Sequence, residues 1–312
     1  PYKPASLYIV KDSAKNNWHI FVSGGEDASN STLARIDYGH SLSNIPNIVN
    51  FGNYNNILAN PVGVFVAKED TSWYGFVLNR FTNKLVRIDF GSNISYTPSL
   101  VDDIGGPAVN AFIFTPNDMT VAKENGLWYF FFTNEATSTV GLIQMGNTLT
   151  NTAPTAGSVG NAAVIDFGDN PTGITYLKDC DSMHLFVTKK ATHELVRIDM
   201  DAPTGPYRGT NFSKFAGMLS HGALSQFMRD RDNIYCFVPN VGDTTVSRIN
   251  LLQCQNANIQ FSTTNQPPAY SYDSAGLYNI YYAVNEGQPD MQIQCKLIRV
   301  LPIPPMLVTN DT

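Results

Sequence analysis

Residues able to do chemistry are spread thinly along this chain of 312 residues. The motifs H-E-x-x-H and G-x-S-x-G do not occur, and the four cysteines form no C-x-x-C pair. The five histidines have no metal-binding spacing: His19, His40, His184, His193 and His221. We therefore expect no catalytic residues and no required cofactor. A structural calcium ion is the one cofactor that this pattern leaves open.

A seven-residue pattern with a basic residue at its third position recurs along the chain. These repeated segments must belong to the elements that position any site. Its copies are Leu33–Gly39, Leu85–Gly91, Val140–Gly146, Leu195–Asp201 and Val246–Leu252, and the basic position is altered in the third copy. The steps between copies are 52, 55, 55 and 51 residues. Spacing of this kind predicts an internal structural repeat.

Two further markers follow the same frame, an apolar stretch that ends in a basic–acidic pair and an aromatic-rich segment. They add a sixth, decayed copy at Ser274 and Ile280–Val284. The segments are short, rich in β-branched and aromatic residues, and bounded by turn residues, which is typical of strands. We predict an all-β fold, a six-bladed β-propeller with four-stranded antiparallel blades, in one domain over residues 1–312. The predicted blades span residues 1–52, 53–106, 107–163, 164–213, 214–261 and 262–312.

The residues repeated around the ring are predicted to be structural. The basic–acidic pairs, such as Lys11-Asp12, close the first strand of each blade at a turn. Arg35 and Asp37 lie two residues apart on one strand face, where they pair with each other or reach a neighbouring blade. Three tryptophans occupy one repeat position, which favours packing between blades over a sugar-stacking platform: Trp18, Trp73 and Trp128.

The candidate site lies in the loops that do not repeat. Loops entering the innermost strands and loops joining second and third strands line one end of a propeller channel, and we predict a ligand-binding rim there. Amides, cations and carboxylates on these loops suit a polar ligand or a glycan. The candidate rim residues are Asn60, Asn170, His221, Arg80, Phe81, Glu135, Lys189, Lys190, Asn240 and Glu286.

Composition narrows the range of partners and compartments. Charged residues make up 15% and the net charge is -6, so no positive field attracts nucleic acid. No apolar run is long enough for a transmembrane helix. This polar, weakly charged composition favours an extracellular or cell-surface protein. The chain starts at Pro1 without a signal peptide, which indicates a processed chain or a piece flanked by further domains.

The repeat also resembles a known family. Pro171–Thr175 is similar to the opening strand of NHL repeats, which build six-bladed propellers. The run Leu33–Asn53 resembles repeats in large surface proteins of Bacteroidetes, which are adhesins or associated with gliding. The resemblance implies an extracellular, envelope-attached setting. It carries no ligand and no functional residue.

We therefore predict a binding or adhesion module of a larger surface protein, recognising a glycan or a surface protein through one rim, and not an enzyme. Two alternatives remain at this point. A structural spacer in a surface filament fits the weak charge and the lack of motifs. A calcium-dependent hydrolase or lactonase fits Asn60, Asp118 and Asn170 if they meet at the channel mouth. A stoichiometric divalent ion would favour the hydrolase.

Overall fold

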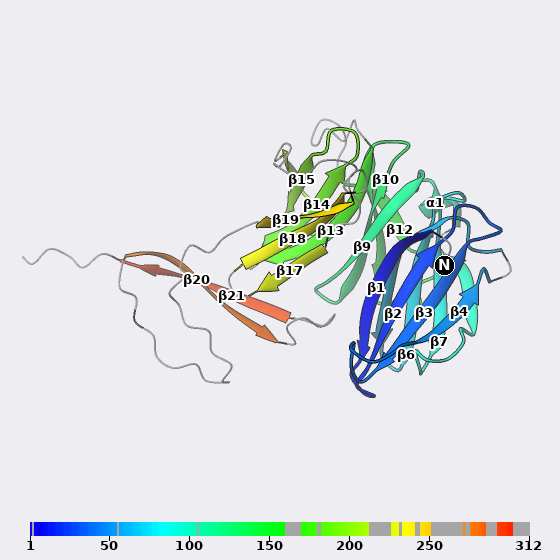
Figure 1. Ribbon diagram of the computed structural model, residues 1–312. Helices are drawn as coiled ribbons and strands as arrows, with labels where there is room; N and C mark the ends of the chain where they lie inside the picture. Colours follow the sequence, from blue (N-terminus) through cyan, green and yellow to red (C-terminus); the bar gives the residue numbers. More distant parts are fainter. Residues whose placement is uncertain are drawn as a thin grey trace, which may run out of the picture.

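The protein is an all-β propeller whose antiparallel sheets are arranged as blades around a common centre (Figure 1). The computed structural model describes residues 1, 3–54, 56–104, 106–159, 170–179, 182–211, 226–230, 233–240, 244–250, 271, 275–284 and 292–301. Four blades have four strands each, and three strands of a fifth blade are described. The first strands of successive blades lie next to one another, so they form the inner wall of the ring.

The strands of each blade follow one another in chain order from the centre outward. The first two blades consist of β1 (Pro4–Asp12), β2 (Asn17–Gly24), β3 (Thr32–Gly39) and β4 (Asn47–Gly52), then β5 (Pro61–Glu69), β6 (Ser72–Asn79), β7 (Lys84–Gly91) and β8 (Leu100–Ile104). A short helix, α1 (Gly106–Asn110), leads into the third blade, and the third and fourth blades consist of β9 (Pro116–Glu124), β10 (Leu127–Asn134), β11 (Thr139–Gly146), β12 (Thr155–Ser158), β13 (Pro171–Asp179), β14 (Ser182–Lys189), β15 (Leu195–Met200) and β16 (Tyr207–Asn211). The fifth blade contains β17 (Gln226–Asp230), β18 (Asn233–Asn240) and β19 (Thr245–Asn250).

Short polar turns separate the strands. The turn residues adopt left-handed backbone angles instead of the extended angles typical of a strand. In the second blade, Asp70 between β5 and β6 and Asn83 between β6 and β7 have φ angles of 53° and 55°. Asp and Asn tolerate this left-handed region better than other non-glycine residues. The flanking β-branched and aromatic residues then pair across each turn in antiparallel register.

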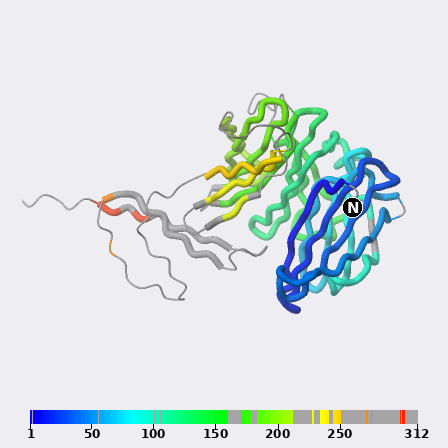
Figure 2. Tube along the Cα trace, viewed as in Figure 1, coloured from blue at the N-terminus to red at the C-terminus, as the bar shows by residue number. Residues whose placement is uncertain are grey.

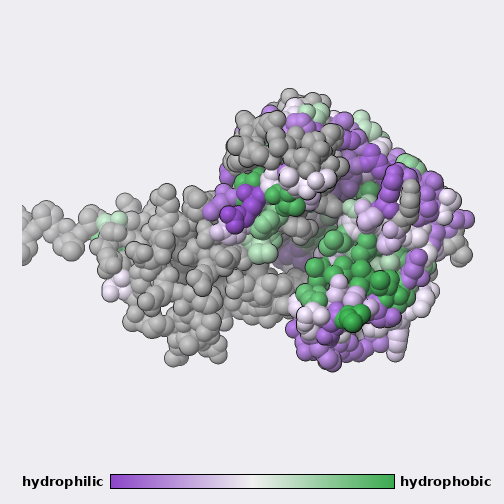
Figure 3. Space-filling view, in the orientation of Figure 1, coloured by the Kyte–Doolittle hydropathy of each residue, from purple (hydrophilic) through white to green (hydrophobic). Residues whose placement is uncertain are grey.

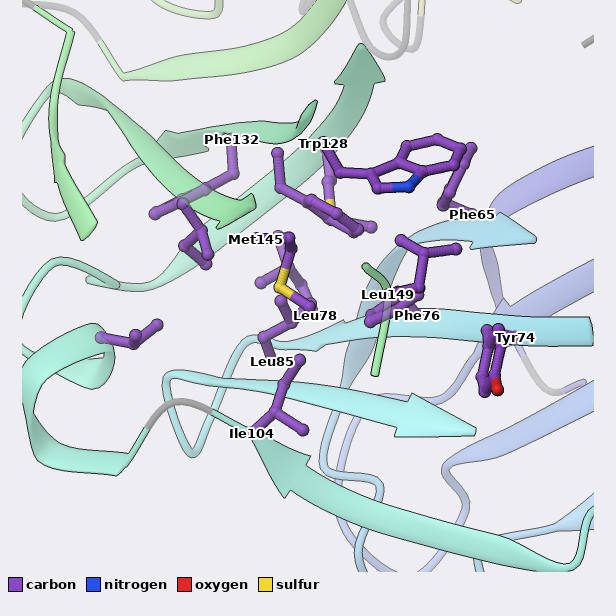
Figure 4. Packing of buried hydrophobic residues seen from close by; sticks show 14 of the residues in the cluster. Phe65, Tyr74, Phe76, Leu78, Leu85, Ile104, Trp128, Phe132, Met145 and Leu149 are labelled. Atoms are coloured by element: carbon purple, nitrogen blue, oxygen red, sulfur yellow. The ribbon is translucent and has the colours of Figure 1, made fainter. Parts of the chain in front are cut away.

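Apolar side chains join each blade to the next. Val10, Phe21 and Leu33 of the first blade share a buried cluster with residues of the second blade. A larger cluster joins the second and third blades (Figure 4). Within it the rings of Phe76 and Phe130 meet edge to face at 4.8 Å. Two further clusters join the third blade to the fourth and the fourth to the fifth. The core is therefore a series of sandwiched layers, each shared by two neighbouring sheets.

The predicted count of six blades is wrong, because the described residues form five blades. The sixth repeat marker, Ile280–Val284, does form a strand, and it lies within β20 (Gly276–Val284). Among the described residues, β20 pairs only with β21 (Gln292–Val300) in a two-stranded sheet. The marker identifies a strand but not the three partners that a blade requires. Figure 2 follows the chain through the five blades in order.

The prediction that Arg35 is structural is confirmed. Its guanidinium is buried, pairs with Asp37, and donates to the carbonyls of Ile94, Ser95 and Tyr96 in the second blade at 2.8, 2.9 and 3.2 Å. Arg87 makes the equivalent, longer contacts to the third blade. The recurring basic position therefore links each of these blades to its successor.

The basic–acidic pairs and the tryptophans also have structural roles, as predicted. The Lys123 ammonium lies 4.5 Å from the centroid of the Trp128 ring, and equivalent pairs occur in the two preceding blades. Trp128 Nε1 donates to Glu69 of the second blade at 2.8 Å. Glu124 in turn accepts from Tyr176 and Lys178 of the fourth blade. The lysine of each of these pairs therefore packs on a tryptophan of its own blade, whereas Glu69 and Glu124 accept hydrogen bonds from the next blade.

Candidate functional site

One end of the ring gathers the loops in which the blades differ, and we call this end the rim. Before β5, β9 and β13, the residues Asn60, Thr115 and Asn170 have left-handed φ angles of 51°, 50° and 56°. Their carbonyls accept the backbone N–H of the residue that follows the second strand in the same blade. Those following residues are Arg80, Glu135 and Lys190. The repeated backbone frame thus presents three different charged side chains at equivalent positions of three successive blades.

Glu135 lies at the centre of this charged group. Arg80 of the second blade forms an ion pair with its carboxylate, and Asn117 Nδ2 donates to Glu135 Oε2 at 3.3 Å. Asn117 also donates to the carbonyl of Pro171 in the fourth blade at 3.2 Å. Burial alone would raise the pKa of Glu135, but Arg80, Asn117 and Lys190 outweigh it and hold this pKa below its ordinary value. Glu135 is therefore an ionised carboxylate, fixed in position but still partly open to solvent.

An irregularity in the inner strands determines where Asn117 points. The pairing between first and second strands shifts register near the rim in the first four blades. Such bulges re-aim side chains and are common next to active sites. In the second and fourth blades the irregular stretch contains Val62-Gly63 and Thr172-Gly173, whereas the third blade places Asn117-Asp118 there. The third blade alone among these four therefore has an amide and a carboxyl group in this stretch, and the amide of Asn117 contacts Glu135.

Asp118 is fully buried between the third and fourth blades. Its Oδ2 accepts from the backbone N–H of Ile174 at 2.9 Å, and its Oδ1 accepts from Met119 at 2.7 Å. Ser6 makes the matching contact to Val64 between the first two blades. Asp118 is thus a positioning residue that holds the inner strands together behind Asn117.

Asp118 should make stability depend on pH. Burial raises its pKa to about 8 from 3.8, against the opposing effect of the N–H groups of Ile174 and Met119. Between these values the folded protein binds a proton that the unfolded chain has released. The stabilising contribution is therefore present below pH 3.8 and is lost as the pH rises through about 8. Asp118→Asn should not show this loss, so its unfolding free energy relative to the native chain should increase from pH 4 to pH 8, which urea unfolding measures.

The control for this prediction is Asp201→Asn. Asp201 is exposed, pairs with Arg208, and has a pKa below its ordinary value, so folding does not raise this pKa into the tested range. The difference in unfolding free energy between Asp201→Asn and the native chain should stay nearly constant from pH 4 to pH 8. Parallel curves for Asp118→Asn and the native chain would show that Asp118 does not titrate in the folded protein.

The other predicted rim residues have different surroundings. Phe81 is exposed next to Arg80. Lys189 is buried and bonded to Glu194 at 2.9 Å, and Asn240 is buried and donates to Thr245 and Ser247 at 3.0 and 2.8 Å. His221 and Glu286 lie outside the described residues. The structure therefore brings Asn60, Arg80, Glu135, Asn170 and Lys190 to the rim, while Lys189 and Asn240 support the turns behind it.

Sequence reasoning missed Asn117 and the carboxylate of Glu26. Asn117 stands where the neighbouring repeats have Val62 or Thr172, so departure from the repeat was the available signal. Glu26 follows β2 in the first blade, pairs with Lys3, and its carbonyl accepts from Asn60 Nδ2 at 3.4 Å. Its position at the rim depends on this contact between blades. Residues near Glu26 in the sequence give no sign of that contact.

Within the described part of the chain, no group of three or more His, Cys, Asp or Glu side chains is placed to hold a metal ion. The described residues also include no helix long and apolar enough to cross a membrane.

The fold and the rim define a β-propeller with an ionised carboxylate at one end of its channel. Among solved structures, the chain is similar to a family 43 β-xylosidase/α-arabinofuranosidase from a compost microbial metagenome, with 11% identity, a TM-score of 0.53, and coverage of 81% of this chain and 92% of that one. It is also similar to a thermostable family 43 glycoside hydrolase (10% identity, TM-score 0.54, coverage 86% and 96%) and to a family 43 enzyme from Xanthomonas citri (11%, 0.53, 83% and 90%). At this level of identity the similarity establishes the fold. The sequence matches no protein-family model and no curated protein, so the resemblance to NHL repeats holds only as far as the propeller fold.

These structural neighbours overturn the prediction of an adhesion module without enzymatic activity, because the three similar solved structures named above are glycoside hydrolases. The prediction rested on the absence of short catalytic motifs. Glycoside hydrolysis needs no such motif, since it uses two carboxyl groups that come from separate parts of a chain. The absence of local motifs was therefore a weak argument against catalysis.

Proposed function

We propose that the protein is a glycosidase that hydrolyses a glycan substrate at the rim, outside the cell. The observation that carries this proposal is Glu135, an ionised carboxylate held by Arg80 and Asn117 and still partly exposed. Similarity in fold to glycoside hydrolases supports the same reaction class. A fixed carboxylate whose partners favour its charged form suits a group that must stay deprotonated at neutral pH.

The reaction requires two carboxyl groups with different roles. The bond between the anomeric carbon and the leaving oxygen breaks, one carboxyl group protonates that oxygen, and the other assists water or attacks the anomeric carbon itself. We assign the second, carboxylate role to Glu135. Glu26 is the candidate proton donor, because its backbone carbonyl accepts from Asn60 Nδ2 at the rim and its side chain is half exposed. That side chain pairs with Lys3, so substrate must displace Lys3 before Glu26 can act as an acid. Asn60 and Arg80 lie between Glu26 and Glu135 and are joined by a backbone hydrogen bond.

Hydrolysis of aryl glycosides tests this proposal. Xylosides, arabinofuranosides and galactosides are the first panel, since solved neighbours include a β-xylosidase/α-arabinofuranosidase and an exo-β-1,3-galactanase. Glu135→Gln should lower kcat about 10²–10⁴-fold for every active substrate, which is the usual contribution of such a group. Glu26→Gln should lower kcat strongly for poor leaving groups and weakly for good ones, since a good leaving group needs little protonation.

Asp201→Asn is the control, because Asp201 is an exposed carboxylate outside the rim that pairs with Arg208. It should retain native kcat. Equal rates for Glu135→Gln and the native chain would remove Glu135 from the mechanism. No hydrolysis of the panel or of plant and bacterial polysaccharides by the native chain would reject the glycosidase proposal.

A further inference from the structure

The first blade exposes an apolar sheet face that we call the first-blade face. It is formed by side chains that are aligned across all four strands of the blade, since Leu7 pairs with Val22, Ile9 with Ile20, and Ile36 with both Ile20 and Ile48. The face consists of Leu7, Ile9, Ile20, Val22, Ile36 and Ile48. Residues on the opposite side of the sheet, including Val10 and Phe21, pack against the second blade.

Equivalent positions in the following blades are covered. Leu7 is 55% exposed, whereas its counterparts Val64, Met119 and Ile174 are 5%, 7% and 2% exposed. These counterparts belong to the clusters that pack each blade onto its predecessor. The first blade has no predecessor, so its matching face is left open to solvent.

The open face is large and continuous. Figure 3 shows a hydrophobic patch over the first blade, and Ile9 and Ile48 within it are 43% and 65% exposed. Contiguous apolar patches of this kind mark interaction sites in soluble proteins. The fifth blade has a comparable open side, because exposed Met228 and Val246 lie on the sheet face opposite Cys236 and Val238, which pack against the fourth blade.

The chain itself supplies an occupant. After β19, residues 251–275 lead to the hairpin of β20 and β21, whose strands of nine residues match the length of β1, β5, β9 and β13. Its sequence is rich in Leu, Ile, Tyr and Val. An isolated two-stranded hairpin is at best marginally stable in water, so this hairpin needs an apolar surface to pack against.

We propose that the β20–β21 hairpin packs on the first-blade face and closes the gap between the fifth and first blades. The hairpin stands apart from the first blade in Figure 1. A connection of 25 residues, 251–275, spans up to about 80 Å when extended, which exceeds the width of the domain. Tethering also favours the hairpin over a second copy of the chain, because it keeps the local concentration of the hairpin high.

Hydrogen exchange on the full-length chain tests this proposal. Ile9→Arg places a charge in the first-blade face, whereas Ile45→Arg places the same charge at a 98% exposed position outside it. Ile9→Arg should raise exchange of amides in residues 276–300 at least about tenfold, since exchange reports loss of local stability. Ile45→Arg should leave those rates unchanged. Unchanged hairpin exchange in Ile9→Arg would overturn the proposal.

Photo-crosslinking provides a second test that does not depend on the folding of Ile9→Arg. Leu7→benzoylphenylalanine retains an apolar side chain on the innermost strand of the face. A crosslink within one molecule to residues 276–300 is the expected product. A crosslink to another segment or to a second copy, or no crosslink, would overturn the proposal, and light scattering would identify a dimer formed through this face.

Discussion

Phe76→Ala should lower the free energy of unfolding by about 3–5 kcal/mol. Phe76 is fully buried between the second and third blades (Figure 4). Its ring lies 4.8 Å from that of Phe130 and 6.4 Å from that of Phe65. The substitution removes apolar contacts, leaves a cavity that the sheets on both sides cannot fill, and breaks an edge-to-face pair. Urea unfolding followed by tryptophan fluorescence measures the change.

Tyr96→Ala is the matched control. Tyr96 is an aromatic residue of the second blade, and its side chain is largely exposed. Its removal should change the unfolding free energy by less than about 0.5 kcal/mol. Equal costs for the two variants would mean that the layer between these blades is not a packed core.

Arg35→Met should cost about 3–5 kcal/mol, as expected when one partner of a buried ion pair is removed. The guanidinium is buried, pairs with Asp37, and satisfies three carbonyls of the second blade. Methionine fills much of the same volume but donates no hydrogen bond. The carbonyls of Ile94, Ser95 and Tyr96 would then lose their donor, and Asp37 would retain only His19. Thermal and urea unfolding both measure this loss.

Arg208→Met provides a control with the same change of residue type. Arg208 also pairs with an aspartate, Asp201, but both side chains are exposed. Exposed pairs contribute about 0–1 kcal/mol. If Arg35→Met costs no more than Arg208→Met, the bonds from Arg35 to the second blade do not contribute to stability.

The sequence predicted the interior of each blade well. The predicted strand segments Leu33–Gly39, Leu85–Gly91 and Val140–Gly146 correspond to β3, β7 and β11, each of which begins one residue earlier. Strand alternation and turn residues are local signals, so they can be recognised without knowing the partners. The structural roles of Arg35 and Trp128 followed from their repetition alone.

The number of blades could not be obtained in the same way. Ile280–Val284 has the composition of a second strand and lies in one of the strands of a hairpin. Strand propensity depends on residues close in sequence, but a blade requires several strands to pair and then to find a neighbouring sheet. The decayed markers of the last copy were the sign that those additional strands were in doubt.

The rim was predicted only in part for a related reason. Arg80 and Glu135 were both candidates, but their pairing joins residues 55 positions apart in different blades. Asn117 was missed because a register shift turns it toward Glu135. Lys189 was predicted to be a ligand-binding residue of the rim, although it lies buried beside Glu194. Loop position predicts which end of the ring a residue occupies, but not which side chains meet there.

Polar side chains of one blade bind the blade that follows it in the chain. This order affects how the protein folds during synthesis. Arg35, Glu69 and Glu124 each use side-chain groups to hold segments of the following blade. A blade emerging from the ribosome therefore carries buried polar groups whose partners are still to be translated, about 60 residues later for Arg35. Each new blade supplies the partners of the one before it. Assembly can thus follow the order of translation, with every completed blade serving as the template on which the next one docks.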